Sequence, residues 1–248
     1  MTLVDETWVV REGILRSPSL WQRGLVAGFT TRALGSMAGG IYPLDEQDRN
    51  RKALAEQLGF ERVVRVRQVH GDVVVHADAV GDPWPLADAM WTATPGLLLG
   101  VAAADCVPVL VADPNGPIGA AHAGWQGTSK RIAVRLVETL VRNGADPDRL
   151  VAAIGPSIGP CCYVIDEPRA VTIRERLGSD SADVLFAGAD GRPVFDLWSA
   201  NVQQLEQAGV RIVDRCDVCT QSGGADVWSY RGENGRNGTG LGIIGRPA

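Results

Sequence analysis

Histidine is scarce in this sequence: among 248 residues there are only three, His70, His76 and His122. A multicopper oxidase needs two histidines and a cysteine for its blue-copper site, and many further imidazoles for a separate trinuclear cluster. Three histidines therefore exclude a true multicopper laccase. A single copper ion can still occupy a site made of histidine and cysteine, because Cu(II) binds more tightly than Zn(II) to most nitrogen and sulfur ligands.

Long apolar runs and blocks of like charge are also missing. No stretch approaches the ~18 apolar residues of a membrane span, and charges scattered through residues 1–16 do not fit the apolar centre of a signal peptide. The net charge is −5, with basic and acidic residues interspersed, which argues against binding nucleic acid or a membrane. We expect a cytoplasmic protein. Because no linker divides the chain, we expect a single domain over residues 1–248.

The basic residues are almost all arginine, a side chain suited to phosphate recognition. Five cysteines, an odd number, favour reduced thiols over a disulfide framework. Cys216 and Cys219 form a C-x-x-C pair that could join Cys161 and Cys162 in a zinc site. Adjacent cysteines on an extended backbone point to opposite faces, however. This pattern therefore favours buried free thiols.

Two further motifs match the sequence patterns of known sites but lack the surrounding structure that those sites need. Ser157 lies in a G-x-S-x-G pattern, but no helix start follows it and no histidine lies after it, as a hydrolase nucleophile requires. We interpret residues 153–160 as a Gly/Pro turn at the end of a strand. Residues 240–245 spell G-x-G-x-x-G, but too little chain follows for a nucleotide-binding helix, so they are expected to form a glycine-rich final strand.

Apolar periodicity predicts an α+β fold with mixed β-sheets and flanking helices. The expected strands cover residues 25–31, 63–69, 73–76, 97–102, 107–112, 118–122, 151–154 and 210–213. Helices are expected over 45–58, over 129–143 with Thr128 or Ser129 as the N-cap and Gly144 closing it, from Asp166, and over 196–208.

One pair of strands brings two reactive side chains together. A Pro-Asn-Gly-Pro turn joins the strands at 107–112 and 118–122, so they should form a hairpin in which Cys106 lies opposite residues 122–124. Cys106 and His122 then meet at its open end. His70 ends another strand-like run and is followed by Gly71. Two histidines and one cysteine can hold zinc with a fourth position open, whereas His76 is expected to be structural.

Several short motifs occur in an order that is similar to one known family. They are RQVHG (67–71), ADCVPV (104–109), HAGWQG (122–127), IGPSIGPCCY (154–163), DLWSAN (196–201), CT (219–220) and SYR followed by GR (229–231 and 235–236). From about residue 28 onward the chain resembles the YfiH-like family. Its members are variously labelled laccase-domain proteins, polyphenol oxidases, purine nucleoside phosphorylases and peptidoglycan editing factors.

The resemblance implies a fold similar to bacterial deamidating toxins with a cysteine–histidine site, and zinc held by catalytic His70, Cys106 and His122. It implies phosphorolysis of adenosine, inosine and methylthioadenosine, with adenosine deamination as a second activity. Phosphorolysis requires an arginine beside phosphate, and Arg32 and Arg231 match family positions. The chain departs from the family where residues 33–44 lack the usual glycine-rich pattern, and where the second arginine after SYR is replaced by glycine.

Two other functions remain open at this point. With Cys106 as a thiolate nucleophile and His122 as base, the site could cleave an amide, such as a wrong amino acid on a UDP-muramyl peptidoglycan precursor. The third possibility is a non-enzymatic metal-binding protein. An open coordination position on a metal inside a pocket argues against it. The expected small-molecule partners are a nucleoside and phosphate, and the sequence makes no prediction of the oligomeric state.

Overall fold

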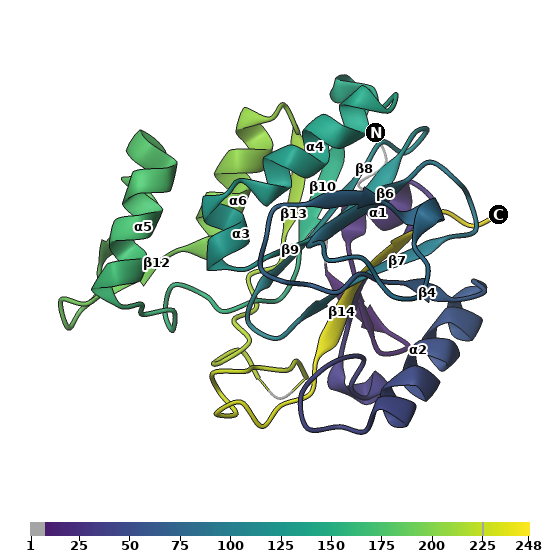
Figure 1. The fold of residues 1–248 in the computed structure, drawn as a ribbon, viewed down its shortest axis with the longest axis horizontal. Coiled ribbons are helices and arrows are strands. Elements are labelled where there is room, and N and C mark those ends of the chain that lie inside the picture. Colours follow the sequence, from purple (N-terminus) through teal and green to yellow (C-terminus); the bar gives the residue numbers. More distant parts are fainter. Residues whose placement is uncertain (1–7, 225) are drawn as a thin grey trace.

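The computed structural model describes residues 8–224 and 226–248, which are built around two six-stranded sheets (Figure 1). The first sheet has the order β1 (Val9–Arg11), β2 (Ile14–Arg16), β3 (Val26–Thr30), β14 (Gly240–Gly245), β7 (Leu98–Ala103) and β4 (Val63–Val64). The second has the order β13 (Ile212–Arg215), β10 (Val151–Ile154), β8 (Val107–Ala112), β9 (Ile118–Ala123), β6 (Ala89–Thr92) and β5 (Val74–His76). A small sheet pairs β11 (Leu185–Ala187) with β12 (Pro193–Phe195).

Both large sheets are mixed, as the sequence predicts. Most neighbouring strands are antiparallel, but β4 runs parallel to β7, β5 to β6, and β10 to β13. The glycine-rich segment of residues 240–245 is the central strand β14, which confirms that it is not a nucleotide-binding turn.

Helices cover the outer faces of the two sheets. On one side, α4 (Ile132–Arg142) and α6 (Leu197–Gln207) pack on the second sheet, near α3 (Trp125–Ser129) and α5 (Glu167–Leu177). On the other, α2 (Leu44–Leu58) covers the first sheet. The short α1 (Pro18–Gln22) instead contacts strands of both sheets, β3, β10 and β13, and its Leu20 joins the core between them. Figure 1 shows α5 standing out from the rest of the molecule. Among the described residues, no helix is long and apolar enough to cross a membrane.

The central strands are buried on both faces, which explains why they are apolar throughout. In β8, Val109 packs toward the helices, whereas Leu110 packs toward the first sheet. In β14, Ile243 packs toward α2, whereas Ile244 contributes to the core between the sheets. Alternating side chains thus join three apolar layers into one continuous scaffold, and the hairpin of β8 and β9 lies at its centre.

The predicted helices are confirmed except at one boundary. Asp166 and Asp196 cap α5 and α6 by accepting backbone N–H groups, and Gly144 follows the end of α4 with a φ of 96°. The expected cap at Thr128 or Ser129 is wrong, because both belong to α3. Arg131 separates α3 from α4 by taking a left-handed conformation with a φ of 61°.

Candidate metal centre and cleft

The β8–β9 hairpin places Cys106 beside His122, as the sequence predicts. Its register pairs Val107 with Ala123 and Pro108 with His122, so Cys106 lies just beyond the paired strands, opposite Gly124. A Cβ atom at Gly124 would come within 2.8 Å of the Cys106 sulfur. Glycine at this position therefore leaves the space that the thiol occupies.

His70 reaches the same place from a sharp turn. Its φ of 57° lies in the left-handed region, which is unusual for a residue other than glycine and needs support from its surroundings. Asp88 supplies that support, since its carboxylate accepts the backbone N–H groups of Val69, His70 and Gly71 at 3.1, 2.9 and 2.6 Å. The predicted strand over residues 63–69 is accordingly shortened to β4, because the chain must leave the sheet to form this turn.

Asp88 also orients His122. The Nδ1 atom of His122 lies 2.9 Å from Oδ1 of Asp88, and the Asp88 side chain is completely buried. The imidazole therefore donates through Nδ1 and directs Nε2 toward the other two residues. Sequence reasoning missed both Asp88 and the strand β6 that follows it and pairs with β9.

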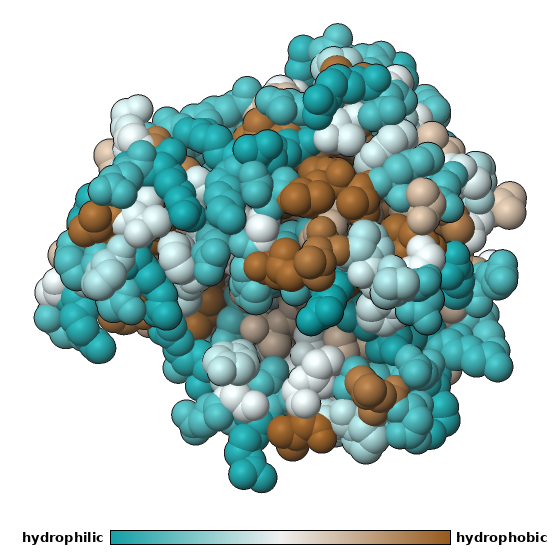
Figure 2. Space-filling view, in the orientation of Figure 1, coloured by the Kyte–Doolittle hydropathy of each residue, from teal (hydrophilic) through white to brown (hydrophobic). Residues whose placement is uncertain are grey.

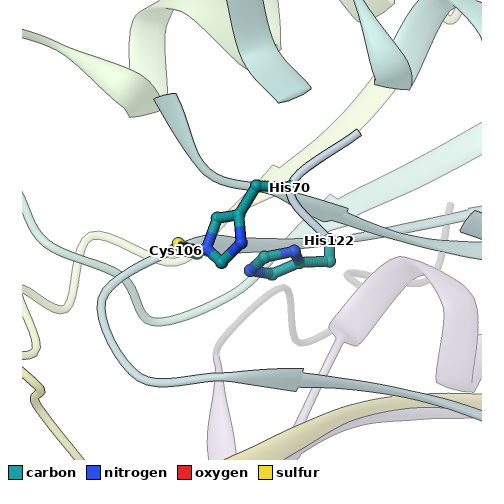
Figure 3. Close-up of side chains that lie close together, drawn as sticks. All are labelled: His70, Cys106 and His122. Carbon is teal, nitrogen blue, oxygen red and sulfur yellow. Dashed lines mark hydrogen bonds between the residues drawn. The ribbon is translucent and has the colours of Figure 1, made fainter. Parts of the chain in front are cut away.

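The three side chains form a tight cluster (Figure 3). The Cys106 sulfur lies 4.0 Å from Nε2 of His70, and the centroids of the two imidazole rings are 4.8 Å apart. Burial opposes ionisation of the Cys106 thiol, but the neighbouring imidazoles outweigh it and lower its pKa to about 6. Burial likewise opposes a charge on His122, yet the Cys106 thiolate and Asp88 raise its pKa to about 9. The cluster thus favours a thiolate.

His70, Cys106 and His122 fit a metal ion in their donor atoms and in their support. One nitrogen or sulfur atom from each lies within 4.8 Å of the others. Two imidazoles and one thiolate form a donor set used by zinc. The carboxylate of Asp88 behind His122 is the usual outer support of a metal-binding histidine. His76 lies apart from this group, where it stacks on Trp91 and contacts Asp78.

The cluster opens into a large cleft. The cleft has a volume of about 940 Å³, near the upper end of the range for small-molecule sites. In Figure 2 the surface is hollowed below its centre, over the region between the sheets and the C-terminal loops. Aromatic side chains line it together with arginines, namely Trp84, Trp125, Tyr163, Tyr230, Arg65, Arg67, Arg169 and Arg231. Flat apolar faces and cations in one cleft suit a flat ring that carries an anion.

The two arginines that the sequence singles out lie in different surroundings. Arg231 lines the cleft, and its guanidinium donates to the Val164 carbonyl at 2.7 Å. Arg32 is not among the described residues that line the cleft. Its guanidinium forms a two-point ion pair with Glu233, donates from Nε to the Val227 carbonyl and lies over the Trp228 ring. Arg32 therefore holds the 227–233 loop in place.

Arg65 was missed by sequence reasoning. Its side chain lines the cleft with only 8% exposure, and its buried Nε has no hydrogen-bond partner among the described residues. Burial, together with the nearby Arg51, lowers its pKa to about 10. The signal available in the sequence was an arginine inside the apolar run Val63–Val64, Val66 and Val69 that leads to His70.

Ser157 is structural, as predicted. It is completely buried, and its Oγ accepts the indole N–H of Trp198 at 2.7 Å. The backbone N–H of Ser157 donates to Val218, so the G-x-S-x-G segment is a turn that ties β10 to the loop after β13.

The fold and site define a class of protein: two stacked mixed sheets that hold a cysteine and two histidines, in metal-binding geometry, at the base of an arginine-lined cleft. Residues 26–247 match the model of a family described as "Multi-copper polyphenol oxidoreductase laccase". The chain belongs to this family, which is the YfiH-like family that the motifs resemble. The family description names a chemistry for which three histidines are too few.

Curated relatives and solved structures agree with this assignment. The chain is 43% identical to "Purine nucleoside phosphorylase" of Deinococcus radiodurans, over 94% of this chain and 93% of that protein. It is 35% identical to "Purine nucleoside phosphorylase YlmD" of Geobacillus stearothermophilus, over 90% of each. The crystal structure of YlmD from that organism superposes with a TM-score of 0.85, covering 98% of this chain and 100% of that one at 32% identity. Bacillus licheniformis YfiH superposes at 0.82 with 28% identity, covering 95% and 97%.

Proposed function

We propose that this chain is a cytoplasmic, zinc-dependent purine nucleoside phosphorylase that acts on adenosine, inosine and methylthioadenosine, with adenosine deamination as a side activity. Support comes from relatives of nearly equal length that carry the phosphorylase name. It also comes from a cleft large enough for a nucleoside and phosphate together.

The observation that carries the proposal is the guanidinium of Arg65. It lies buried in the cleft wall, where Nη1 donates to the Met37 carbonyl at 3.4 Å and the guanidinium lies over the Trp84 ring. Its Nε is free, and no carboxylate forms an ion pair with it among the described residues. A buried cation without an anionic partner is costly, and a bound anion would relieve that cost. Phosphate matches the planar, forked donors of arginine, so Arg65, Arg231 and the exposed Arg67 are its proposed ligands.

Each group at the site has a role in this proposal. The aromatic walls formed by Trp84 and Tyr230 would contact the purine and ribose, while the arginines hold phosphate beside C1′. His70, Cys106 and His122 would hold zinc, which when bound supplies Lewis-acid chemistry and lowers the pKa of a coordinated oxygen. Asp88 keeps His122 in the orientation that this requires.

The proposal is tested by assaying base release from adenosine with and without inorganic phosphate. We expect the release of adenine from adenosine, and of hypoxanthine from any inosine formed by deamination, to require phosphate and to yield ribose 1-phosphate. Arg65→Lys keeps the positive charge but removes the paired N–H donors of the guanidinium. It should raise the KM for phosphate by about 10- to 100-fold without changing the zinc content. Arg174→Ala is the matched control, because Arg174 pairs with exposed Glu167 on α5. Phosphate-independent base release would contradict the phosphorylase assignment.

Deamination is distinguished in the same assay, since inosine formation needs water and should persist without phosphate.

A second candidate, the cysteine–histidine amidase with the likeness to deamidating toxins, is favoured by one observation: the pKa of the Cys106 thiol is lowered to about 6 beside His122. Cleavage of a UDP-muramyl amide that is abolished by Cys106→Ser, in the absence of any nucleoside reaction, would replace the phosphorylase proposal with this one.

A further inference from the structure

Three cysteines from two distant segments meet next to Tyr163, a residue that lines the cleft. Cys161 and Cys162 follow β10, and Cys219 lies in the loop after β13. Their sulfur atoms all lie within 4.8 Å of one another, and those of Cys161 and Cys162 are 3.4 Å apart. All three are free thiols. The site that holds His70, Cys106 and His122 shares no residue with this cluster.

The adjacent cysteines face the same way because their backbone is not extended. Residues 160–162 form a turn, in which the N–H groups of Cys162 and Tyr163 both donate to the Gly159 carbonyl at 3.0 Å. The expectation that adjacent side chains point to opposite faces is therefore wrong here, since it holds only for a strand. Cys216, the other half of the C-x-x-C pair, is buried and does not belong to the cluster.

The spacing of the three sulfur atoms suits a metal ion. At a Zn–S distance of about 2.3 Å, tetrahedral ligands are separated by roughly 3.8 Å, within the range of separations in the cluster. The backbone N–H of Gly159 donates to the Cys219 sulfur at 3.3 Å and so fixes its orientation. The hydroxyl of Ser222 lies 3.5 Å from the Cys161 sulfur and offers an oxygen for a fourth position. Exposed Cys161 leaves the cluster open to solvent.

We propose that Cys161, Cys162 and Cys219 form a second metal site, which takes a thiophilic divalent ion with a preference for tetrahedral coordination, such as Zn(II). Binding forms three metal–sulfur bonds and releases one proton from each neutral thiol to solvent, with no oxidation or reduction. Three thiolates select such soft ions over Mg(II) or Ca(II), which prefer oxygen ligands.

An ion at this site would join two segments that shape the cleft. Tyr163 follows the first pair of cysteines and lines the cleft, and the Cys162 carbonyl lies 3.5 Å from a guanidinium nitrogen of Arg231. Thr220 follows Cys219 and donates to Asp105, another cleft residue, at 2.6 Å. Metal binding in the thiol cluster should therefore stabilise the cleft wall as well as the loop.

Metal stoichiometry tests the site directly. Metal-free protein, reduced and kept anaerobic, is titrated with Zn(II) and with Cd(II), whose thiolate absorption reports the number of sulfur ligands. We expect two ions per wild-type chain, and one for Cys161→Ser combined with Cys162→Ser. Cys216→Ser is the matched control and should keep two. His70→Ala should keep the ion with the larger thiolate absorption, which separates this inference from the zinc content of the cleft.

A second pair of measurements leaves the three cysteines unaltered, so that a poorly folded cysteine variant cannot decide the result. Zn(II) should slow alkylation of the exposed Cys161 at least tenfold, as followed by mass spectrometry of its peptide, and should raise the melting temperature of the His70→Ala variant. One ion per wild-type chain with unprotected Cys161 would overturn the inference. A disulfide within the cluster that forms readily in place of metal binding would overturn it as well.

Discussion

Replacing Asp88 by asparagine tests how the proposed metal centre of the cleft is held together. The carboxylate is completely buried, and each of its oxygens accepts two hydrogen bonds. Oδ1 accepts from His122 Nδ1 and from the His70 backbone, and Oδ2 accepts from the backbones of Val69 and Gly71. An asparagine side chain keeps one acceptor oxygen, whichever way its amide is turned. Its NH2 group would then face two N–H donors.

The size of the effect follows from the bonds that are lost. Two hydrogen bonds to a charged acceptor contribute about 1.5–3 kcal/mol each, so Asp88→Asn should lower the free energy of unfolding by about 3–6 kcal/mol. Loss of a carboxylate behind a metal-binding histidine weakens metal affinity by about 10- to 100-fold. We therefore expect a weaker zinc affinity in this range, with the activity restored in part by excess zinc.

Zinc affinity is measured by competition with a chromophoric chelator below the melting temperature, and stability by denaturant unfolding of metal-free protein. Asp72→Asn is the control, because the partly exposed Asp72 pairs with the exposed Arg135 at 3.0 Å and its loss should change stability by less than about 1 kcal/mol. If Asp88→Asn bound zinc as tightly as the wild type, Asp88 would have no positioning role and the reasoning would be refuted.

Three further changes probe the scaffold. Ser157→Ala should leave kcat within a few-fold of the wild type, because the hydroxyl is buried in a turn; a thousandfold loss in a folded variant would make it catalytic. Burial disfavours a charge on Asp113, but Arg149 and backbone N–H groups lower its pKa to about 2. The ionised Asp113 carboxylate therefore stabilises the folded protein by about 2 kcal/mol above pH ~4, and this contribution is lost as the pH falls toward ~2. In acid titrations, the difference in free energy of unfolding between the wild type and Asp113→Asn should become smaller over that interval. Gly155→Ala would place a Cβ atom 2.3 Å from the Phe29 ring and should destabilise the protein by about 1–3 kcal/mol; an unchanged melting temperature would contradict this packing.

Much of the fold was accessible from local patterns. Strands β8 and β9 are apolar and joined by a short Gly/Pro turn, and a turn of fixed length sets the register of the strands that it joins. That register brought Cys106 to His122 without knowledge of any other element. Asp166 and Asp196 capped their helices because capping depends on residues within one turn. The break between α3 and α4 was missed, because the left-handed conformation of Arg131 has no local signal in a long apolar periodicity.

The sequence by itself thus determined the hairpin and most helix positions, because those features depend on neighbours along the chain. It also named all three residues of the candidate metal centre, although the hairpin register brings together only Cys106 and His122. The tertiary structure alone decided the rest. It brought Asp88 under His70 and His122, buried Arg65 in the cleft wall and paired Arg32 with Glu233. It also joined Cys219 to the Cys161–Cys162 turn. These contacts link residues that are far apart in the sequence, so they form only when both sheets have packed. The local preferences of a segment do not specify which distant segment will lie next to it.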